Sequence, residues 1–262
     1  NSVYLANAPN NTTSSAEFNV SLGINSLNSI TTGNKNVAIG YNSLITSTTG
    51  HDNTAVGYKA LTSLTLTTQF TDNASYNTAV GGEALMSVTT GHSNTGIGNN
   101  ALKSVNTGDN NVSIGRKALE NLTTGQHNIA IGSNGTGSSI QTGSNNIIIG
   151  SANVDVGNST STNQIIIGHG ATGHGNNIVV IGNGTTTAWH PHDTNEVDLG
   201  STQYSFKDVH LDGDISFSGN ATSNITTTNQ ILSIQSGANL NLQSAGETNI
   251  STTINNQNIN IT

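Results

Sequence analysis

The stretch that decides the fold reads Asn36-Val-Ala-Ile-Gly40-Tyr-Asn-Ser-Leu44, and Asn53 opens a second copy of it 17 residues further on. Glycines that end an apolar tripeptide recur at intervals of 17, 17, 24, 17, 17, 17, 18, 18 and 14 residues. They are Gly23, Gly40, Gly57, Gly81, Gly98, Gly115, Gly132, Gly150, Gly168 and Gly182. A nearly fixed period of this length is the signature of a repeat architecture, in which each unit stacks on the next.

One repeat contains the signals of a single solenoid coil. The alternation in Asn-Val-Ala-Ile predicts a half-buried strand, and Thr-Thr-Gly followed by polar residues predicts a turn. Gly40 and Gly50 mark two corners where a positive φ or tight packing excludes a side chain. We assign this structural role to the first-corner glycines Gly40, Gly57, Gly81, Gly98, Gly115 and Gly132. The fold class that follows is all-β, a solenoid of about 17-residue coils.

Two apolar columns are expected to stack inside this solenoid. The residue before each corner glycine is predicted to point inward, at Ile39, Val56, Val80, Ile97, Ile114 and Ile131. A second column is predicted at Leu44, Leu61, Leu85, Leu102 and Leu119. The small residues Ala38, Ala55, Ala79 and Ala130 would let another surface approach closely. From residue 145 the strands become fully apolar, as in Asn146-Ile-Ile-Ile-Gly150, which predicts burial on both faces.

Composition supports a thin solenoid over other classes. Of the 262 residues, 8% are charged and 32% are hydrophobic, against about 25% and 45–50% in ordinary globular domains. Disordered chains combine low hydrophobicity with high charge, which this chain lacks. Six Lys and Arg against fourteen Asp and Glu leave no basic stripe for nucleic acid. No stretch approaches the roughly 18 apolar residues of a membrane span, so we expect no membrane insertion.

The chain is predicted to divide into four parts: residues 1–18, a β-roll at 19–186, a transition module at 187–218 and a β-rich stalk at 219–262. The only methionine is Met86, so we expect a processed product or a fragment. The interval of 24 after Gly57 places seven extra residues within 62–76. Insertions in repeats map to exposed loops, often on a binding face. The predicted binding residues of this insertion are Phe70, Thr71, Asp72 and Tyr76.

The Asn-x-Ala-Ile-Gly units resemble the left-handed β-roll heads of trimeric autotransporter adhesins. The 17-residue form, with Thr-Thr-Gly and Ala-Leu, is similar to repeats of phage tail fibres and related bacterial surface fibres. The segment from Asp198 to Ile215 resembles the linker that precedes the terminal domains of tail fibres and tailspikes. These resemblances imply a left-handed β-roll in a homotrimer, located outside the cell on a virion tail fibre or a bacterial surface.

The C-terminal third, from residue 219, alternates apolar and polar residues in short runs. A single chain offers little apolar surface there, so we expect three chains to intertwine in a β-prism-like stalk. The implied partners are two further copies of this chain and a cell-surface glycan or protein receptor.

One candidate metal site lies in the transition module. In a trimer, three copies of His190-Pro191-His192 meeting on the axis would supply six imidazoles, which suits an octahedral transition metal. The alternative is a solvated loop beside Trp189. No other cofactor is expected, because calcium repeats need an Asp in every coil. His51, His92 and His127 follow the Thr-Thr-Gly turns and are expected to be exposed.

The function predicted first is a structural fibre for attachment to a host or cell surface, most simply a phage tail fibre shaft. A bacterial surface trimeric adhesin is the alternative of the same build. A tailspike-type polysaccharide depolymerase could use two of the carboxylates in 187–218, but we favour their assignment as solvated caps of turns, because no paired aromatics flank them. These carboxylates are Asp193, Glu196, Asp198, Asp208, Asp212 and Asp214. An ice-binding solenoid is the last alternative. We expect no enzyme, because no Gly-x-Ser-x-Gly elbow or cysteine nucleophile occurs.

Overall fold

The computed structural model describes residues 2–4, 16–65, 74–186, 203–204 and 206–211. The chain divides into two compact units, Asn1–His192 and Asp193–Thr262. The strands of the described residues all lie in the first unit, and these residues contain no helix. The predicted stalk at 219–262 and most of the transition module lie outside the described residues.

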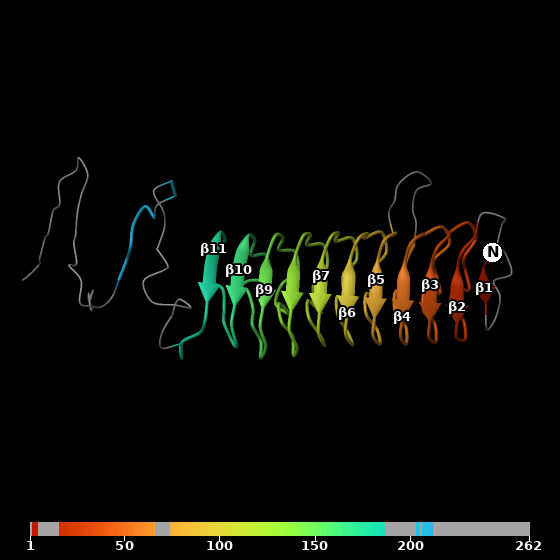
Figure 1. Cartoon of the computed structure of the whole chain (residues 1–262), viewed down its shortest axis with the longest axis horizontal. Helices are drawn as coiled ribbons and strands as arrows, with labels where there is room; N and C mark the ends of the chain where they lie inside the picture. The colour runs from red at the N-terminus through yellow and green to blue at the C-terminus, as the bar shows by residue number, and fades with distance from the viewer. Residues whose placement is uncertain (1, 5–15, 66–73, 187–202, 205, 212–262) are drawn as a thin grey trace, which may run out of the picture. The chain divides into compact units, whose positions relative to one another are not determined.

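The first unit is an all-parallel β-solenoid, which confirms the predicted all-β coil architecture. Its strands hydrogen-bond in sequence order from β1 to β11, one strand per coil (Figure 1). The strands are β1 (Val3–Tyr4), β2 (Val20–Leu22), β3 (Val37–Ile39), β4 (Thr54–Val56), β5 (Thr78–Val80), β6 (Thr95–Ile97), β7 (Val112–Ile114), β8 (Ile129–Ile131), β9 (Ile147–Ile149), β10 (Gln164–Ile167) and β11 (Ile178–Ile181).

The register places each repeat position on its own copy in the next coil. Ala38 is opposite Ala55, and Ala55 is opposite Ala79. The second of these pairs spans the interval of 24 residues, so the extra residues do not shift the sheet. Coil-to-coil hydrogen bonds resume on both sides of the insertion, from Thr65 N to Thr89 O and from Ala74 N to Thr90 O. The seven additional residues are therefore accommodated between Thr65 and Ala74.

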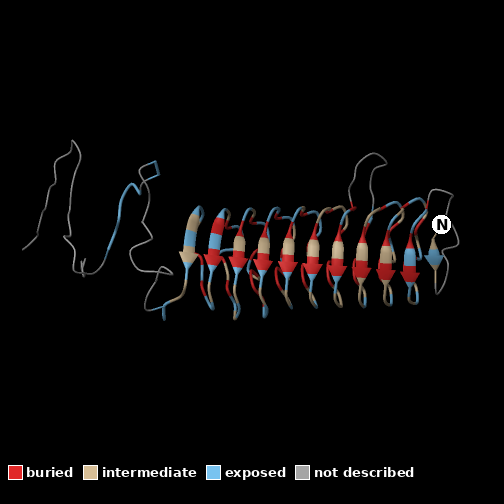
Figure 2. Cartoon of the chain, viewed as in Figure 1, coloured by how far each residue is buried: buried red, intermediate tan, exposed pale blue. Residues whose placement is uncertain are grey.

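The strands turn their small central residue inward and their larger residues outward, the reverse of the prediction. Ala38, Ala55 and Ala79 are fully buried, whereas Ile97 and Ile114 are each 38% exposed (Figure 2). The expected inward column of Ile39, Val56, Val80, Ile97, Ile114 and Ile131 is therefore wrong, and so is the expected access of another surface to the alanines. The predicted leucine column is fully buried, as expected.

The leucines explain this orientation by volume. A Cβ placed on the strand residue Gly96 would lie 3.2 Å from Leu85 Cγ, so the leucine of the turn already fills the coil. Protein interiors are close-packed, so even one additional methylene group disturbs the packing. Only Ala, Ser or Gly fits at the centre of these strands.

Later coils exchange the large and small positions. Gly137 stands where the preceding coil has Leu119, and the central strand residue becomes Ile148. A Cβ at Gly137 would lie 3.1 Å from Ile148 Cδ1, so the isoleucine occupies the leucine's space. Only this middle residue is buried: Ile147 is half-buried and Ile149 is 37% exposed. The predicted burial of both strand faces is wrong for these coils.

The corner glycines combine a positive φ with close contact to the next coil. Gly40 has a φ of 133°, and a Cβ there would lie 2.4 Å from Gly57 O of the next coil. Gly57, Gly81, Gly98, Gly115 and Gly132 repeat both features. The second corner differs, because Gly50 does not have a positive φ. A side chain is excluded there because a Cβ on Gly50 would lie 2.8 Å from Ala74 O. The coils therefore stack too closely at both corners for any side chain.

Candidate functional site

The predicted binding loop is described only at its base. Phe70, Thr71 and Asp72 lie outside the described residues. Tyr76 is described and is 47% exposed, in the left-handed backbone region with a φ of 59°. Its ring meets His51 of the preceding coil edge to face, with centroids 5.1 Å apart and planes at 90°. The base of the insertion therefore presents a tyrosine to solvent and fixes it against a histidine.

An acidic partner holds this histidine. His51 Nδ1 lies 2.9 Å from Asp52 Oδ2, and the two side chains are 29% and 35% exposed. Two coils further on, the backbone N of His92 donates to Asp109 Oδ1 at 2.9 Å, and His92 Nε2 lies 3.6 Å from the same oxygen. His51 and His92 are therefore partly buried and anchored, which corrects the expected exposed positions, whereas His127 is exposed as predicted.

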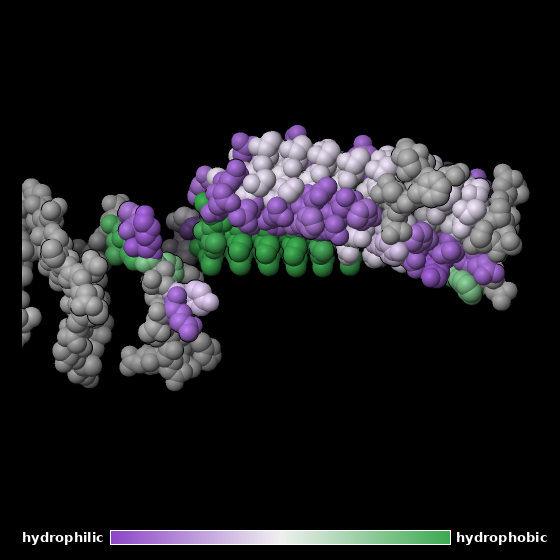
Figure 3. Space-filling view, turned by 90° about the horizontal axis from the view of Figure 1, so that it is seen from above, coloured by the Kyte–Doolittle hydropathy of each residue, from purple (hydrophilic) through white to green (hydrophobic). Residues whose placement is uncertain are grey.

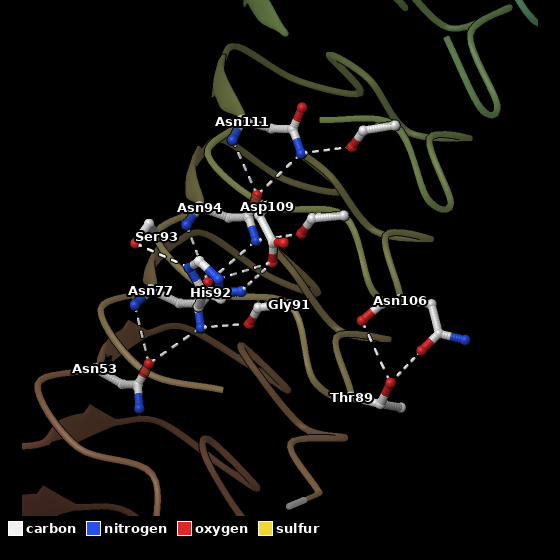
Figure 4. A network of polar contacts seen from close by, with 12 residues as sticks. Asn53, Asn77, Thr89, Gly91, His92, Ser93, Asn94, Asn106, Asp109 and Asn111 are labelled. Atoms are coloured by element: carbon white, nitrogen blue, oxygen red, sulfur yellow. Dashed lines mark hydrogen bonds and ion pairs between the residues drawn. The ribbon is translucent and has the colours of Figure 1, made fainter. Parts of the chain in front are cut away.

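A row of buried asparagines runs beneath these turns and was not predicted. The side-chain amide of Asn94 donates to Asn77 Oδ1 at 3.3 Å and to Gly108 O at 2.8 Å (Figure 4). The same pattern joins coil to coil throughout. We call this set the asparagine row: Asn19, Asn36, Asn53, Asn77, Asn94, Asn111, Asn128 and Asn146. Gln164 follows it, with Nε2 bonded to Gly175 O and Oε1 buried without a partner. The row is structural, because its members are fully buried.

The turns of the middle coils carry a small charged cluster. Glu83 Oε2 accepts from Lys103 Nζ at 2.8 Å, and Lys117 Nζ lies 3.3 Å from Glu120 Oε2. The hydrogen bond from Lys103 holds the pKa of Glu83 below its ordinary value. The hydrogen bond to Glu83 raises the pKa of Lys103. The first pair joins two neighbouring coils, whereas the second lies within a single turn.

The outer face of the sheet carries an unbroken line of aliphatic side chains. We call it the aliphatic ladder: Leu22, Ile39, Val56, Val80, Ile97, Ile114, Ile131, Ile149, Ile167 and Ile181. Most members are between 36% and 48% exposed. Figure 3 shows this hydrophobic stripe along one side of the later coils of the solenoid. Large contiguous apolar patches on soluble chains mark interaction sites.

One open hollow of about 420 Å³ lies between the last coils, lined by residues of 156–161 and 173–176 that include His174. Among the described residues, no three His, Cys, Asp or Glu side chains gather as a metal site. The predicted metal ligands His190 and His192 lie outside the described residues. Within the described ranges, no helix has the length and hydrophobicity that crossing a bilayer requires.

No family model, no curated protein and no solved structure matches the chain.

Proposed function

We propose that this chain is a structural fibre protein that assembles as a homotrimer and attaches to a host or cell surface, as a phage tail fibre shaft does. The aliphatic ladder is the observation that carries the proposal. Its members repeat once per coil from Leu22 to Ile181 with no polar interruption. A surface this regular is suited to another surface with the same spacing, and a second copy of the chain has that spacing.

The energetics favour association through this face. Burying apolar surface stabilises by about 25 cal/mol per Å². Each ladder residue contributes little, but the contributions of successive coils add along the face. The neighbouring outward column mixes the threonines of β4 to β6 with valine or isoleucine in the other strands from β2 to β11, and it is half-buried in the middle coils. The aliphatic ladder would form the centre of the contact, and this mixed column its rim, as interfaces usually have an apolar core and a polar rim.

The other functions have less support. A bacterial surface adhesin shares the trimeric build, and the same ladder supports it equally. An ice-binding solenoid needs threonine in every coil of a flat face. Outward threonines occur in three consecutive strands, at Thr54, Thr78 and Thr95, and give way to Val112 and Ile129. The carboxylates of a depolymerase other than Asp208 lie outside the described residues, so no observation favours that activity.

The mass of the particle in solution tests the assembly. Light scattering with size-exclusion chromatography should give three times the chain mass. The double variant I97D/I114D should be monomeric, because burying unpaired carboxylates costs several kcal/mol. Thr124→Asp, an exposed turn substitution, is the control and should remain trimeric. A monomeric wild type, or a trimeric double variant, contradicts the proposal.

Attachment is tested separately. Fluorescently labelled wild-type protein should bind to the surface of bacterial cells of at least some strains in a panel, and the bound fraction should fall when unlabelled protein competes. Three copies of each binding site in one particle raise avidity without strong single contacts. The monomeric I97D/I114D variant should therefore bind more weakly than the trimer at equal chain concentration. No specific binding to any strain contradicts attachment and leaves the assembly result standing.

A further inference from the structure

Two tyrosine rings lie stacked on the surface of two neighbouring coils. Tyr41 and Tyr58 each follow a corner glycine, and their ring centroids lie 5.7 Å apart with an interplanar angle of 11°. The backbone holds the two residues side by side, because Lys59 N donates to Tyr41 O at 2.9 Å. The proximity of the two rings is therefore a consequence of the coil stacking itself.

Both tyrosines are accessible from solvent. Tyr41 is 45% exposed and Tyr58 is 49% exposed. The Lys59 ammonium lies 5.2 Å from the centroid of the Tyr58 ring, and Tyr58 keeps this exposure with the ammonium in place. Exposed side chains change rotamer within picoseconds to nanoseconds, and rotation about χ2 of tyrosine is broad. The ring edges can therefore meet while the two backbones stay hydrogen-bonded.

Two adjacent phenols can be coupled by oxidation. A one-electron oxidant removes an electron from a phenol, the hydroxyl proton leaves, and a neutral tyrosyl radical remains. Its unpaired electron is shared with the two Cε carbons beside the carbon that carries the oxygen. Two such radicals combine by forming a bond between one Cε of each ring. Each joined Cε then loses its hydrogen as a proton while the oxygen of that ring gains one, which restores both phenols.

We propose that Tyr41 and Tyr58 form a modification site, at which a one-electron oxidant of the haem-peroxidase class links the two rings as dityrosine. With hydrogen peroxide as the electron acceptor, the two tyrosines together lose two hydrogen atoms and the peroxide is reduced to two molecules of water. Two reactants that are already held together react far faster than two that must meet by diffusion. The inference does not depend on the attachment function.

The link would join two coils covalently. The 262 residues contain no cysteine, so a disulfide cannot play this part. A bond between Tyr41 and Tyr58 closes a ring of one repeat and constrains the unfolded chain, as a disulfide does. In a repeat solenoid each unit contacts only its neighbours, so the link opposes the separation of these two coils.

Oxidation of the purified full chain with a haem peroxidase and hydrogen peroxide, at low protein concentration, tests the site. Cleavage after Lys35 and Lys59 releases both tyrosines in one peptide, which should be lighter by two hydrogen atoms. A further cut before Asp52 should leave the halves that contain Tyr41 and Tyr58 joined. The product should show the blue fluorescence of dityrosine, and after denaturation it should have the mass of one chain.

Conservative variants assign the link to this pair. Tyr41→Phe and Tyr58→Phe each keep a ring in the stack but remove the hydroxyl from which the radical forms, so each should abolish the joined peptide. The matched control is Tyr76→Phe, whose ring contacts His51, and it should give the wild-type yield. Oxidised wild type should melt at a higher temperature than oxidised Tyr58→Phe, whereas the two should melt alike before oxidation.

The outcomes that overturn the proposal are equally specific. They are the absence of dityrosine in the oxidised wild type, a link formed only between chains, and a joined peptide that persists in either Tyr41→Phe or Tyr58→Phe. Equal melting temperatures of the oxidised wild type and the oxidised Tyr58→Phe variant would overturn the stabilising effect of the link.

Discussion

Asn111 and Asn94 are joined twice through a single oxygen: the backbone N of Asn111 donates to Asn94 Oδ1 at 3.0 Å, and its side-chain Nδ2 donates to the same atom at 3.1 Å. Asn94 in turn bonds Asn77 and Gly108. The described coils from Asn19 to Asn146 repeat this arrangement, so every member supports the coil before it and the coil after it.

Replacing one member of this asparagine row should be strongly destabilising. Asn94→Ala leaves Asn77 Oδ1, Asn111 N and Gly108 O with fewer partners inside the solenoid, and each unsatisfied buried group costs about 1–3 kcal/mol. We expect a loss of about 3 kcal/mol or more in the free energy of unfolding, measured by urea denaturation. The control is Thr124→Ala on an exposed turn, which should change stability by less than about 0.5 kcal/mol. Equal effects of the two variants would contradict this role.

The exchange of volume between Gly137 and Ile148 predicts a compensating pair. Ile148→Ala should cost about 2–5 kcal/mol because it leaves a cavity, and Gly137→Leu alone should overpack the coil. Leucine tolerates the backbone there, since Leu119 of the preceding coil has a φ of 49° and Gly137 a φ of 69°. The double variant G137L/I148A restores the composition of the earlier coils. A double-mutant cycle should therefore give a favourable coupling energy, and strictly additive effects would rule out the volume exchange.

Close stacking at the first corner predicts a difference between two glycines of similar backbone. At Gly98, φ is 132° and a Cβ would lie 2.5 Å from Gly115 O, whereas Gly175 has a φ of 148° and nothing within 4 Å. Backbone strain of about 1–3 kcal/mol applies to alanine at both positions. Gly98→Ala should lower the melting temperature clearly more than Gly175→Ala. The difference measures the close approach, and equal losses would show that backbone conformation alone requires these glycines.

The ion pair between Glu83 and Lys103 predicts a small, pH-dependent contribution. The pKa of Glu83 is held below its ordinary value of 4.5, so its contribution is present above that value and is lost as the pH falls through the lowered folded-state pKa. The pKa of Lys103 is raised above its ordinary 10.5, so its contribution is present below that value and is lost as the pH rises through the raised one. The difference in melting temperature between wild type and Glu83→Gln should be small at pH 7 and should vanish in acid. High salt should reduce it too, and a difference that persists in strong acid would exclude the ion pair as its cause.

Most of the features that could be predicted followed from the 17-residue spacing of the repeats. The nearly constant spacing located the coils from β2 to β11 but not the strand β1, which lies in the segment 1–18 that was predicted apart from the β-roll. The corner glycines and the leucine column followed from the same spacing. The direction of the strand side chains could not be predicted from the spacing, because an alternating pattern defines two faces of a strand but does not show which face is buried. Isoleucine and alanine both suit a buried strand, and only the leucine packed behind Gly96 decides between them.

The sites were harder to predict for different reasons. An asparagine opened nearly every repeat, but asparagine is usually exposed, so the pattern gave no indication of a buried row. The stacking of Tyr41 on Tyr58 could have been predicted from the sequence, since residues one period apart lie at the same position of neighbouring coils. The contact of Tyr76 with His51 was hidden by the insertion, which lengthens the interval between equivalent positions at that coil to 24 residues.

The asparagine row also has an electrical consequence. Each side-chain amide donates toward the N-terminal coil and accepts from the C-terminal one, from Asn36 to Asn146. Amide dipoles aligned head to tail polarise one another and strengthen each link. The solenoid therefore contains a line of side chains whose moments add along the stacking direction, as peptide units do in a helix. Its two ends differ electrostatically, so the stack has a built-in sense of direction that does not depend on any charged residue.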